Sequence, residues 1–212
     1  MVKIIMLSAN ILFKGDDTGY FIKFGQKEHL KQIQNGIVRF SELTCFSANK
    51  KQTAIYDKYE GIKYLKHQRN GKTVFERIKE MQFISCFSYF IKKDVLHNRI
   101  VSPQIFEERN WSYVLFIIES DKFRTNIESA LSNFRHASNI VTYVDFKKDQ
   151  ENLTIFNKSD EYEFEKEFRF VFYPNDELIF LKKNKRTVNI KIEKVNSLII
   201  PTKEFVNCFS IE

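Results

Sequence analysis

The chain has 212 residues, of which 43% are hydrophobic, and its 22 Phe and 9 Tyr supply enough apolar area for a packed core. Its 34 Lys and Arg against 27 Asp and Glu give a formal net charge of +7, which favours polyanionic partners without naming one. With only 6 Gly and 3 Pro there is no linker, repeat or low-complexity run. This excludes a repeat protein and predicts a single domain over residues 1–212.

The sequence lacks the features of a membrane or secreted protein. No segment approaches membrane-spanning length, and the apolar start at residues 1–7 is interrupted too early for a signal peptide. Cys45, Cys86 and Cys208 are far apart and match neither a disulfide framework nor a zinc motif. We therefore expect a cytoplasmic protein with reduced cysteines and no membrane partner.

Hydrophobic periodicity predicts the following elements in chain order. Helices are expected over 26–35, 73–81 and 121–134, and strands over 20–24, 37–40, 83–88, 112–119, 140–146, 161–173, 177–181, 187–193 and 196–200. Gly36 ends the first helix at a position that favours a left-handed backbone. Residues 41–71 are irregular and polar, and loops of that length are typically functional or mobile. Helices lie early and strands crowd late, which predicts an α+β fold with mixed, mostly antiparallel sheets and few helices.

The segment 162–172 alternates apolar and charged residues along one predicted strand. Its apolar side carries Phe164, Phe168, Phe170 and Phe172, and its charged side carries Glu163, Glu165, Glu167 and Arg169. Like charges along one strand face disfavour pairing, at a cost of up to about 1 kcal/mol each. A solvent-facing strand explains the alternation without any function. A functional role for the carboxylates is the second interpretation.

Basic and aromatic residues gather in the middle of the long irregular region. The basic members are Lys63, Lys66, Arg69 and Lys72, and the aromatic members are Tyr56, Tyr59 and Tyr64. Such groups bind single-stranded nucleic acid by phosphate pairing and base stacking. The four basic residues are our candidate nucleic-acid contacts, with RNA favoured. A second basic run at 182–186 is better explained as a solvated hairpin tip.

The commonest catalytic motifs are absent from the sequence. It has no Walker A loop, GxGxxG, HExxH or GxSxG, and its 4 His lack metal-ligand spacing, so we expect no resident metal. Glu165 and Glu167 share a predicted strand face and are able to hold a divalent ion, with Asp57 or Asp145 from another element. A metal-dependent nuclease therefore stays as an alternative.

Three segments together resemble the ADP-ribosyltransferases in order and residue type. They are a basic residue on a first strand, Lys23, hydroxyls on a later strand, Ser85 and Ser88, and a late Glu-x-Glu pair, Glu165 and Glu167. The chain also resembles a large prokaryotic family found beside phage-defence and toxin systems, which is similar to ADP-ribosyltransferase-like toxins, among them one that modifies messenger RNA. The matching segments are 22–25, 28–30, 33–40, 57–61, 84–88, 141–143, 156–158 and 165–170.

The resemblance implies NAD as substrate and assigns the two carboxylates distinct roles. Glu167 would face the positive charge that develops on the ribose as nicotinamide leaves, and Glu165 would position the acceptor. Arg169 would contact the cofactor side of the site or orient Glu167 by a charge-assisted hydrogen bond.

The same resemblance implies an NAD-binding set. Lys23 would neutralise the pyrophosphate, where Arg or His is more typical, and Ser85 with Ser88 would hold the ribose. Tyr59 or Phe87 would stack on nicotinamide. Lys23 also has a structural explanation, because lysines in apolar strands often extend from a sheet edge.

These inferences predict an NAD-dependent ADP-ribosyltransferase toxin that modifies nucleic acid, with an antitoxin protein as a possible partner. Two alternatives remain open at this point. One is the metal-dependent nuclease that uses Glu165 and Glu167. The other is a non-catalytic interaction protein whose carboxylate face contacts a basic partner.

Overall fold

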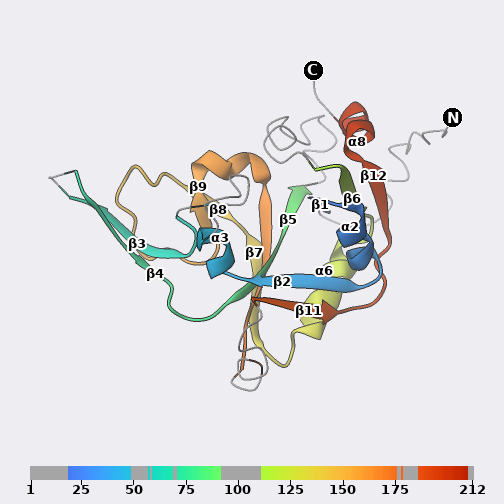
Figure 1. Ribbon diagram of the computed structural model, residues 1–212, viewed down its shortest axis with the longest axis horizontal. Coiled ribbons are helices and arrows are strands. Elements are labelled where there is room, and N and C mark those ends of the chain that lie inside the picture. The colour runs from blue at the N-terminus through green and yellow to red at the C-terminus, as the bar shows by residue number, and fades with distance from the viewer. Residues whose placement is uncertain are drawn as a thin grey trace.

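The computed structural model describes residues 19–48, 57, 59–68, 71–91, 111–175, 178 and 186–209. An eight-stranded sheet forms its centre (Figure 1). Its strands are β1 (Gly19–Gly25), β2 (Ile37–Glu42), β5 (Phe83–Ile91), β6 (Tyr113–Ile117), β7 (Arg135–Ile140), β10 (Glu167–Tyr173), β11 (Thr187–Lys191) and β12 (Ser197–Pro201). Every pairing in this sheet is antiparallel.

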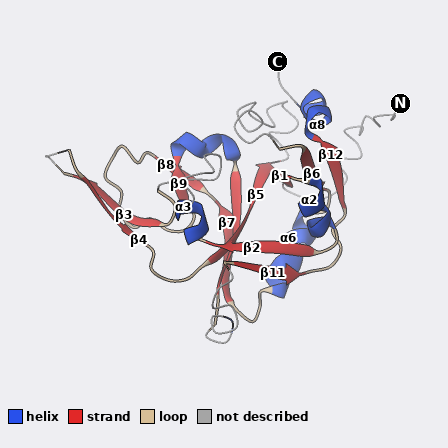
Figure 2. Ribbon diagram, in the orientation of Figure 1, coloured by secondary structure: helices blue, strands red, loops and turns tan. Residues whose placement is uncertain are grey.

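Two small sheets and five short helices complete the described fold (Figure 2). The small sheets pair β3 (Ile62–His67) with β4 (Thr73–Arg77), and β8 (Thr142–Val144) with β9 (Asn157–Ser159). The helices are α2 (Lys27–Gln34), α3 (Thr44–Ala48), α6 (Ser120–Ala130), α8 (Thr202–Phe209) and the 3₁₀ helix η1 (Asp160–Glu165). The predicted mixed α/β architecture of mostly antiparallel strands with few helices is confirmed. None of the described helices is long and apolar enough to cross a membrane.

The main sheet forks at β5. One edge of β5 pairs with β10 over its first six residues, while the other edge pairs with β2 at Phe83 and Ile84 and with β1 from Ser88 onward. Between those two contacts the edge of β5 has no strand beside it among the described strands. The ammonium of Lys23, which follows the last β1 residue paired to β5, donates a hydrogen bond to the Cys86 carbonyl in this gap. Lys23 therefore satisfies a backbone acceptor that the fork leaves without a ladder partner.

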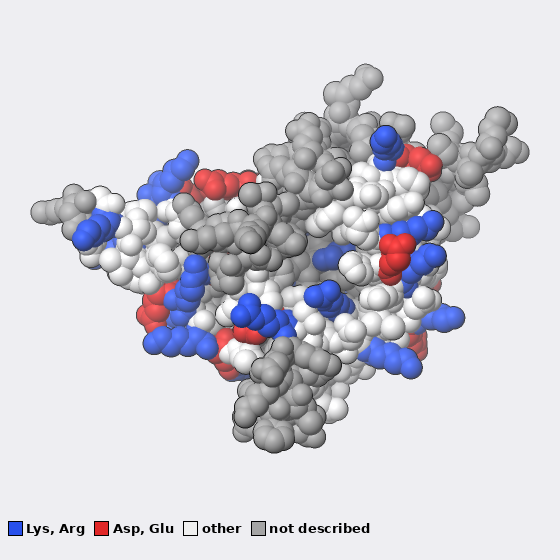
Figure 3. Space-filling model, viewed as in Figure 1, with Lys and Arg blue, Asp and Glu red and all other residues white. Residues whose placement is uncertain are grey.

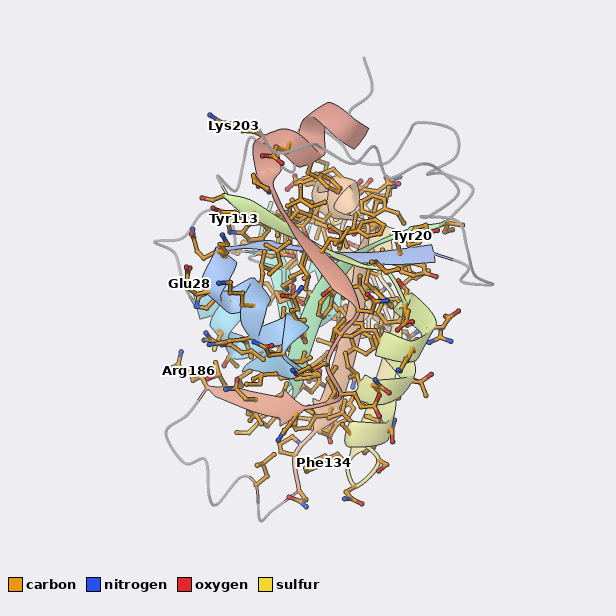
Figure 4. All side chains as sticks on the ribbon, turned by 90° about the vertical axis from the view of Figure 1, so that its right-hand side faces the viewer. Tyr20, Glu28, Tyr113, Phe134, Arg186 and Lys203 are labelled. Carbon is orange, nitrogen blue, oxygen red and sulfur yellow. The ribbon has the colours of Figure 1, made fainter. Side chains whose placement is uncertain are left out.

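An aromatic core fills one face of the sheet. Alternate residues of a strand point to one face, and Phe168, Phe170 and Phe172 of β10 are all buried there as predicted. Phe21 of β1 packs against Phe168, with the two ring centroids 5.0 Å apart. Leu30 of α2 contributes to the same core, as do residues of α6, and Figure 4 shows side chains filling the space between these two helices and the strands.

The strand predicted over 161–173 is wrong in its first half. Residues Asp160–Glu165 form η1, and Lys166 then takes a left-handed backbone with φ of 45° before β10 begins. Phe164 consequently packs in a different cluster from the three buried phenylalanines of β10. The charged side is not wetted either, because Glu167 is 5% exposed and Arg169 is 1% exposed. Of the four residues on the predicted charged side, Glu163, which pairs with Lys166, is the exposed one.

Three further predictions need correction. The helix expected over 73–81 is a strand, β4, because Thr73–Arg77 pairs with β3, with one irregularity between Ile62 and Tyr64, and this pairing overrides a weak amphipathic pattern. The region 41–71 is not structureless, since it contains α3 and β3. The strand expected over 140–146 is divided between the end of β7 and β8. The strand predicted over 177–181 and the basic run at 182–186 lie outside the described residues, apart from Leu178 and Arg186, as does Arg69.

Gly36 confirms the predicted end of the first helix. Its φ is +81°, and a Cβ there would lie 2.3 Å from the carbonyl oxygen of Ile192. The backbone amide of Ile192 donates to the Gly36 carbonyl at 2.8 Å. Glycine at this position therefore allows both the left-handed turn after α2 and the close passage of the chain that follows β11.

Candidate functional site

A pocket lies where β1 diverges from β5, on the sheet face that carries Glu167. Its cavity volume is about 80 Å³, which is smaller than that of a typical small-molecule site. Its polar lining consists of Lys23, Glu60, Ser88, Lys158, Glu165 and Glu167, and its aromatic lining of Phe24, Phe46, Phe87 and Trp111. A concave site that combines aromatic walls with a few converging charges is the arrangement expected for ligand binding.

Five of the residues named from the sequence line this pocket. They are Lys23, Phe87, Ser88, Glu165 and Glu167, contributed by β1, β5, η1 and β10. Strand register accounts for the pair from β5 and β10, because Ser88 is the partner both of Ile22 on β1 and of Glu167 on β10. Because cross-strand partners point to the same face, Ser88 and Glu167 lie side by side.

The other predicted NAD contacts lie elsewhere. Ser85 is paired with Phe170 and faces the aromatic core, since residues three apart on a strand point to opposite faces. Tyr59 stacks on Phe146 with ring centroids 4.7 Å apart and is not part of the pocket lining. Arg169 is buried behind Glu167 rather than in the lining. Phe87, the alternative stacking residue, does line the pocket.

A buried network of ion pairs fixes both catalytic candidates. The ammonium of Lys158 lies 2.5 Å from Glu165 Oε2 and 2.9 Å from Glu167 Oε2. On the other side of Glu167, Arg169 Nε donates to Oε1 at 2.7 Å. The remaining nitrogens of Arg169 grip the Glu60 carboxylate at 2.8 and 2.9 Å and donate to the Ile155 carbonyl. This bidentate fork is the geometry in which arginine binds carboxylate most strongly.

The network keeps Glu167 ionised. Burial raises the pKa of Glu167, but the charges of Arg169 and Lys158 outweigh burial and hold that pKa well below its usual range. For Arg169, burial lowers the pKa, and the carboxylates of Glu167 and Glu60 raise it well above its usual value. Glu167 is consequently a permanent negative charge at neutral pH rather than a proton-accepting base.

Neighbouring groups set the position of Glu167 and are not nucleophiles themselves. The backbone amide of Glu167 donates to the Tyr143 hydroxyl of β8 at 2.8 Å, which anchors the start of β10. Burial raises the pKa of Tyr143. Burial, reinforced by Glu167, also raises the pKa of the Cys86 thiol, so Cys86 is a protonated wall of the pocket and not a reactive thiolate.

A tight turn before β3 delivers Glu60 to Arg169. Asp57 begins the turn, accepting the Tyr59 amide on its Oδ1 at 2.8 Å, and its carbonyl accepts the Glu60 amide at 3.1 Å. Gly61 then adopts a φ of +70°, where a Cβ would lie 2.8 Å from Leu43 Cδ2. Asp57 and Gly61 are therefore turn-forming residues, and the turn directs the carboxylate of Glu60, which lies between them in the chain, toward Arg169.

Sequence reasoning from charge patterns missed Glu60, Tyr143 and Lys158. A signal for them was present, because they lie in the short segments 57–61, 141–143 and 156–158 that carry the family resemblance. In the structure these segments, from separate parts of the chain, meet at Glu167 and Arg169. The convergence shows that the segments form one site.

Asp57 makes the stability of the fold depend on pH. Burial, followed by the nearby charge of Glu60, raises the pKa of Asp57 from 3.8 to about 6, and Oδ2 has no hydrogen-bond partner among the described residues. A raised pKa means that the folded state binds more protons than the unfolded state between about pH 4 and pH 6, so this group costs stability as the pH rises through that window.

We expect Asp57→Asn to stabilise the protein above about pH 6 and to have little effect near pH 4. A shift of about two pKa units corresponds to at most about 3 kcal/mol, and asparagine retains the acceptor for the Tyr59 amide. Urea unfolding of both proteins at the two pH values measures the difference. An equal gain at both pH values would show that ionisation of Asp57 is not the cause.

The donor set near Glu167 does not fit a metal ion. In the part of the chain that the structure describes, no group of three or more His, Cys, Asp or Glu is placed to hold one. The ammonium of Lys158 already occupies the space between Glu165 and Glu167, at 2.5 and 2.9 Å from their oxygens. A divalent ion shared by these two carboxylates would have to displace that cation.

Comparisons of the chain with family models, curated proteins and solved structures found no match. What the pocket does is therefore inferred from its own geometry and charge.

Proposed function

We propose that the chain is an ADP-ribosyltransferase that uses NAD to modify a nucleic acid, RNA in preference, as a toxin in a toxin–antitoxin or phage-defence setting. One observation carries the proposal. Lys23, Ser88 and Glu167 come from β1, β5 and β10, in that chain order, and line the same pocket. This is the order and the residue chemistry that the resemblance to ADP-ribosyltransferases implies.

The charge state of the pocket suits the reaction. Transfer from NAD breaks the bond between nicotinamide and ribose, and positive charge develops on the ribose as the bond lengthens. A fixed carboxylate next to that charge lowers the barrier, because it needs no reorganisation during the reaction. Glu167 meets this requirement, since its ion pairs keep it both ionised and oriented. Glu165, held by the same ammonium, is the acceptor-side group.

The rest of the lining offers candidate groups for the two ends of a dinucleotide. Lys23 supplies a cation for the pyrophosphate, and its ammonium lies 5.1 Å from the centroid of the Phe87 ring. Phe46 and Trp111, which are only partly buried, offer aromatic surfaces on which nicotinamide can stack, in place of Tyr59 and of Phe87, whose ring is 2% exposed. Ser88, beside Glu167, is the hydroxyl available to the ribose, while Ser85 supports the core.

The experiment that tests the proposal follows the label of NAD. NAD carrying a radioactive adenylate phosphate is incubated with the purified chain, single-stranded RNA and single-stranded DNA, with and without EDTA. We expect the label to appear on nucleic acid, RNA above DNA, and to be unaffected by EDTA. RNA cleavage that needs no NAD and stops with EDTA would favour the nuclease instead. If the nucleic acid is not labelled and no nicotinamide is released, the non-catalytic interaction protein is favoured.

A further inference from the structure

The β3–β4 hairpin, which we call the arm, extends away from the main sheet. Figures 1 and 2 show it at the left of the molecule, beyond the elements that build the pocket. The four residues Thr73–Glu76 of β4 are all exposed, and Val74 and Phe75 are 47% and 48% exposed. Large apolar side chains on a projecting hairpin are not explained by the core of this protein.

The arm carries an excess of positive charge. Its described residues and the short segment that follows, 62–80, contain five Lys or Arg and two Glu. Both acids are already paired, Glu76 with Lys79 at 4.0 Å and Glu80 with Arg135. Lys63 and Lys66 have no acidic partner within the described residues. Figure 3 shows Lys and Arg side chains along this part of the surface.

Phe75 provides a stacking surface beside one of these cations, Arg77. The guanidinium of Arg77 lies 5.2 Å from the centroid of the Phe75 ring, and Leu65, its cross-strand partner, is fully buried beneath the arm. Val74 is the neighbour of Phe75 in the strand and therefore points to the opposite face, beside Lys66. The two exposed apolar residues thus form no continuous patch of the kind that protein partners bury.

The root of the arm is tied to the pocket. Arg77, the last residue of β4, donates a hydrogen bond to the backbone carbonyl of Glu60, whose carboxylate lines the pocket and binds Arg169. Leu65 exchanges backbone hydrogen bonds of 2.9 Å with Gln150, which fixes the arm to the loop after β8. A ligand that runs along the arm is therefore led to the edge of the pocket.

We propose that the arm binds single-stranded nucleic acid and directs it to the pocket. Lys63, Lys66 and Lys72 contact phosphates, and Phe75 stacks on a base. This inference deepens the proposed function, because it rests on a nucleic acid being the acceptor, but binding to the arm requires no NAD. Scattered cations with one exposed ring match the way proteins hold single strands without reading their sequence.

The test is fluorescence anisotropy of a labelled single-stranded RNA of about 12 nucleotides, without NAD, at salt concentrations from about 50 to 200 mM. We expect Phe75→Ala to weaken binding by about 5- to 100-fold, as for loss of one base stack. The double variant Lys63→Ala/Lys66→Ala should weaken binding and flatten the slope of log affinity against log salt by about 1.4, for two lost phosphate contacts on a single strand.

The matched control is Lys122→Ala/Lys203→Ala, which removes the same charge from exposed lysines of α6 and α8. It should change binding far less than the arm double variant. Equal losses in the two double variants, or unchanged binding in Phe75→Ala, would overturn the proposal. Displacement of the RNA by poly-glutamate at equal concentration would assign the arm to an acidic protein partner instead. RNA binding that depends on the arm without any ADP-ribosyl transfer would refute the proposed function and leave the arm proposal intact.

Discussion

Glu167→Gln is expected to lower ADP-ribosyl transfer by at least about 100-fold, the usual effect of removing one group that stabilises transition-state charge. Glutamine keeps the size of the side chain but removes the negative charge that the proposed mechanism sets opposite the positive charge developing on the ribose. The measurement is the initial rate at which label moves from NAD to RNA, together with the rate of nicotinamide release. In cells, expression of the wild type should slow growth, and expression of Glu167→Gln should not.

Destabilisation has to be separated from lost chemistry, because Glu167 is also a structural partner of Arg169 and Lys158. Glu60→Gln is the matched variant, since it likewise removes a buried carboxylate from Arg169. We expect the two variants to lose similar stability in thermal unfolding, while Glu60→Gln retains most of the transfer activity. Glu163→Gln, an exposed change in the same segment, should alter neither. Equal losses of transfer in Glu60→Gln and Glu167→Gln would remove the catalytic assignment of Glu167.

The fold prediction was accurate where neighbouring residues determine an element and wrong where contacts with distant parts of the chain determine it. Over 19–42 the strand, helix, glycine and strand were predicted because local periodicity and the backbone of Gly36 determine them. The helix prediction over 73–81 was wrong because pairing with β3 makes this segment a strand. The local pattern around Val74 and Phe75 does not reveal that pairing. The break before β10 depends on the left-handed backbone of Lys166, a residue type that rarely signals one.

The burial of the charged residues at the site could not be predicted from the sequence. Alternation of Glu167 and Arg169 with phenylalanines indicates a wetted face, yet η1, the β8–β9 sheet and the turn at Glu60 cover this face in the structure. The alternation has the same form whether the polar side meets water or a second layer. For Ser85 and Ser88 the sequence was sufficient. Residues three apart on a strand point to opposite faces, so their spacing already excluded a shared site.

Arg169→Met is expected to lower the free energy of unfolding by about 3–5 kcal/mol, more than any other single change considered for this chain. Methionine fills similar space but leaves two buried carboxylates, Glu60 and Glu167, without their shared cation. For a chain of this size such a loss corresponds to a fall in Tm of roughly 6–20 °C. Denaturant unfolding at neutral pH measures it directly.

The control for that experiment is Arg135→Met, because Arg135 pairs with Glu80 of the segment between β4 and β5 but is largely exposed. Exposed ion pairs contribute about 0–1 kcal/mol, so Arg135→Met should have a small effect. Adding Glu60→Gln to Arg169→Met should restore part of the stability, since it removes one of the two stranded charges, and this non-additivity is the signature of direct coupling. If Arg169→Met costs no more than Arg135→Met, the buried network does not hold the site together, and Glu167 would lack the fixed charge on which the proposed chemistry depends.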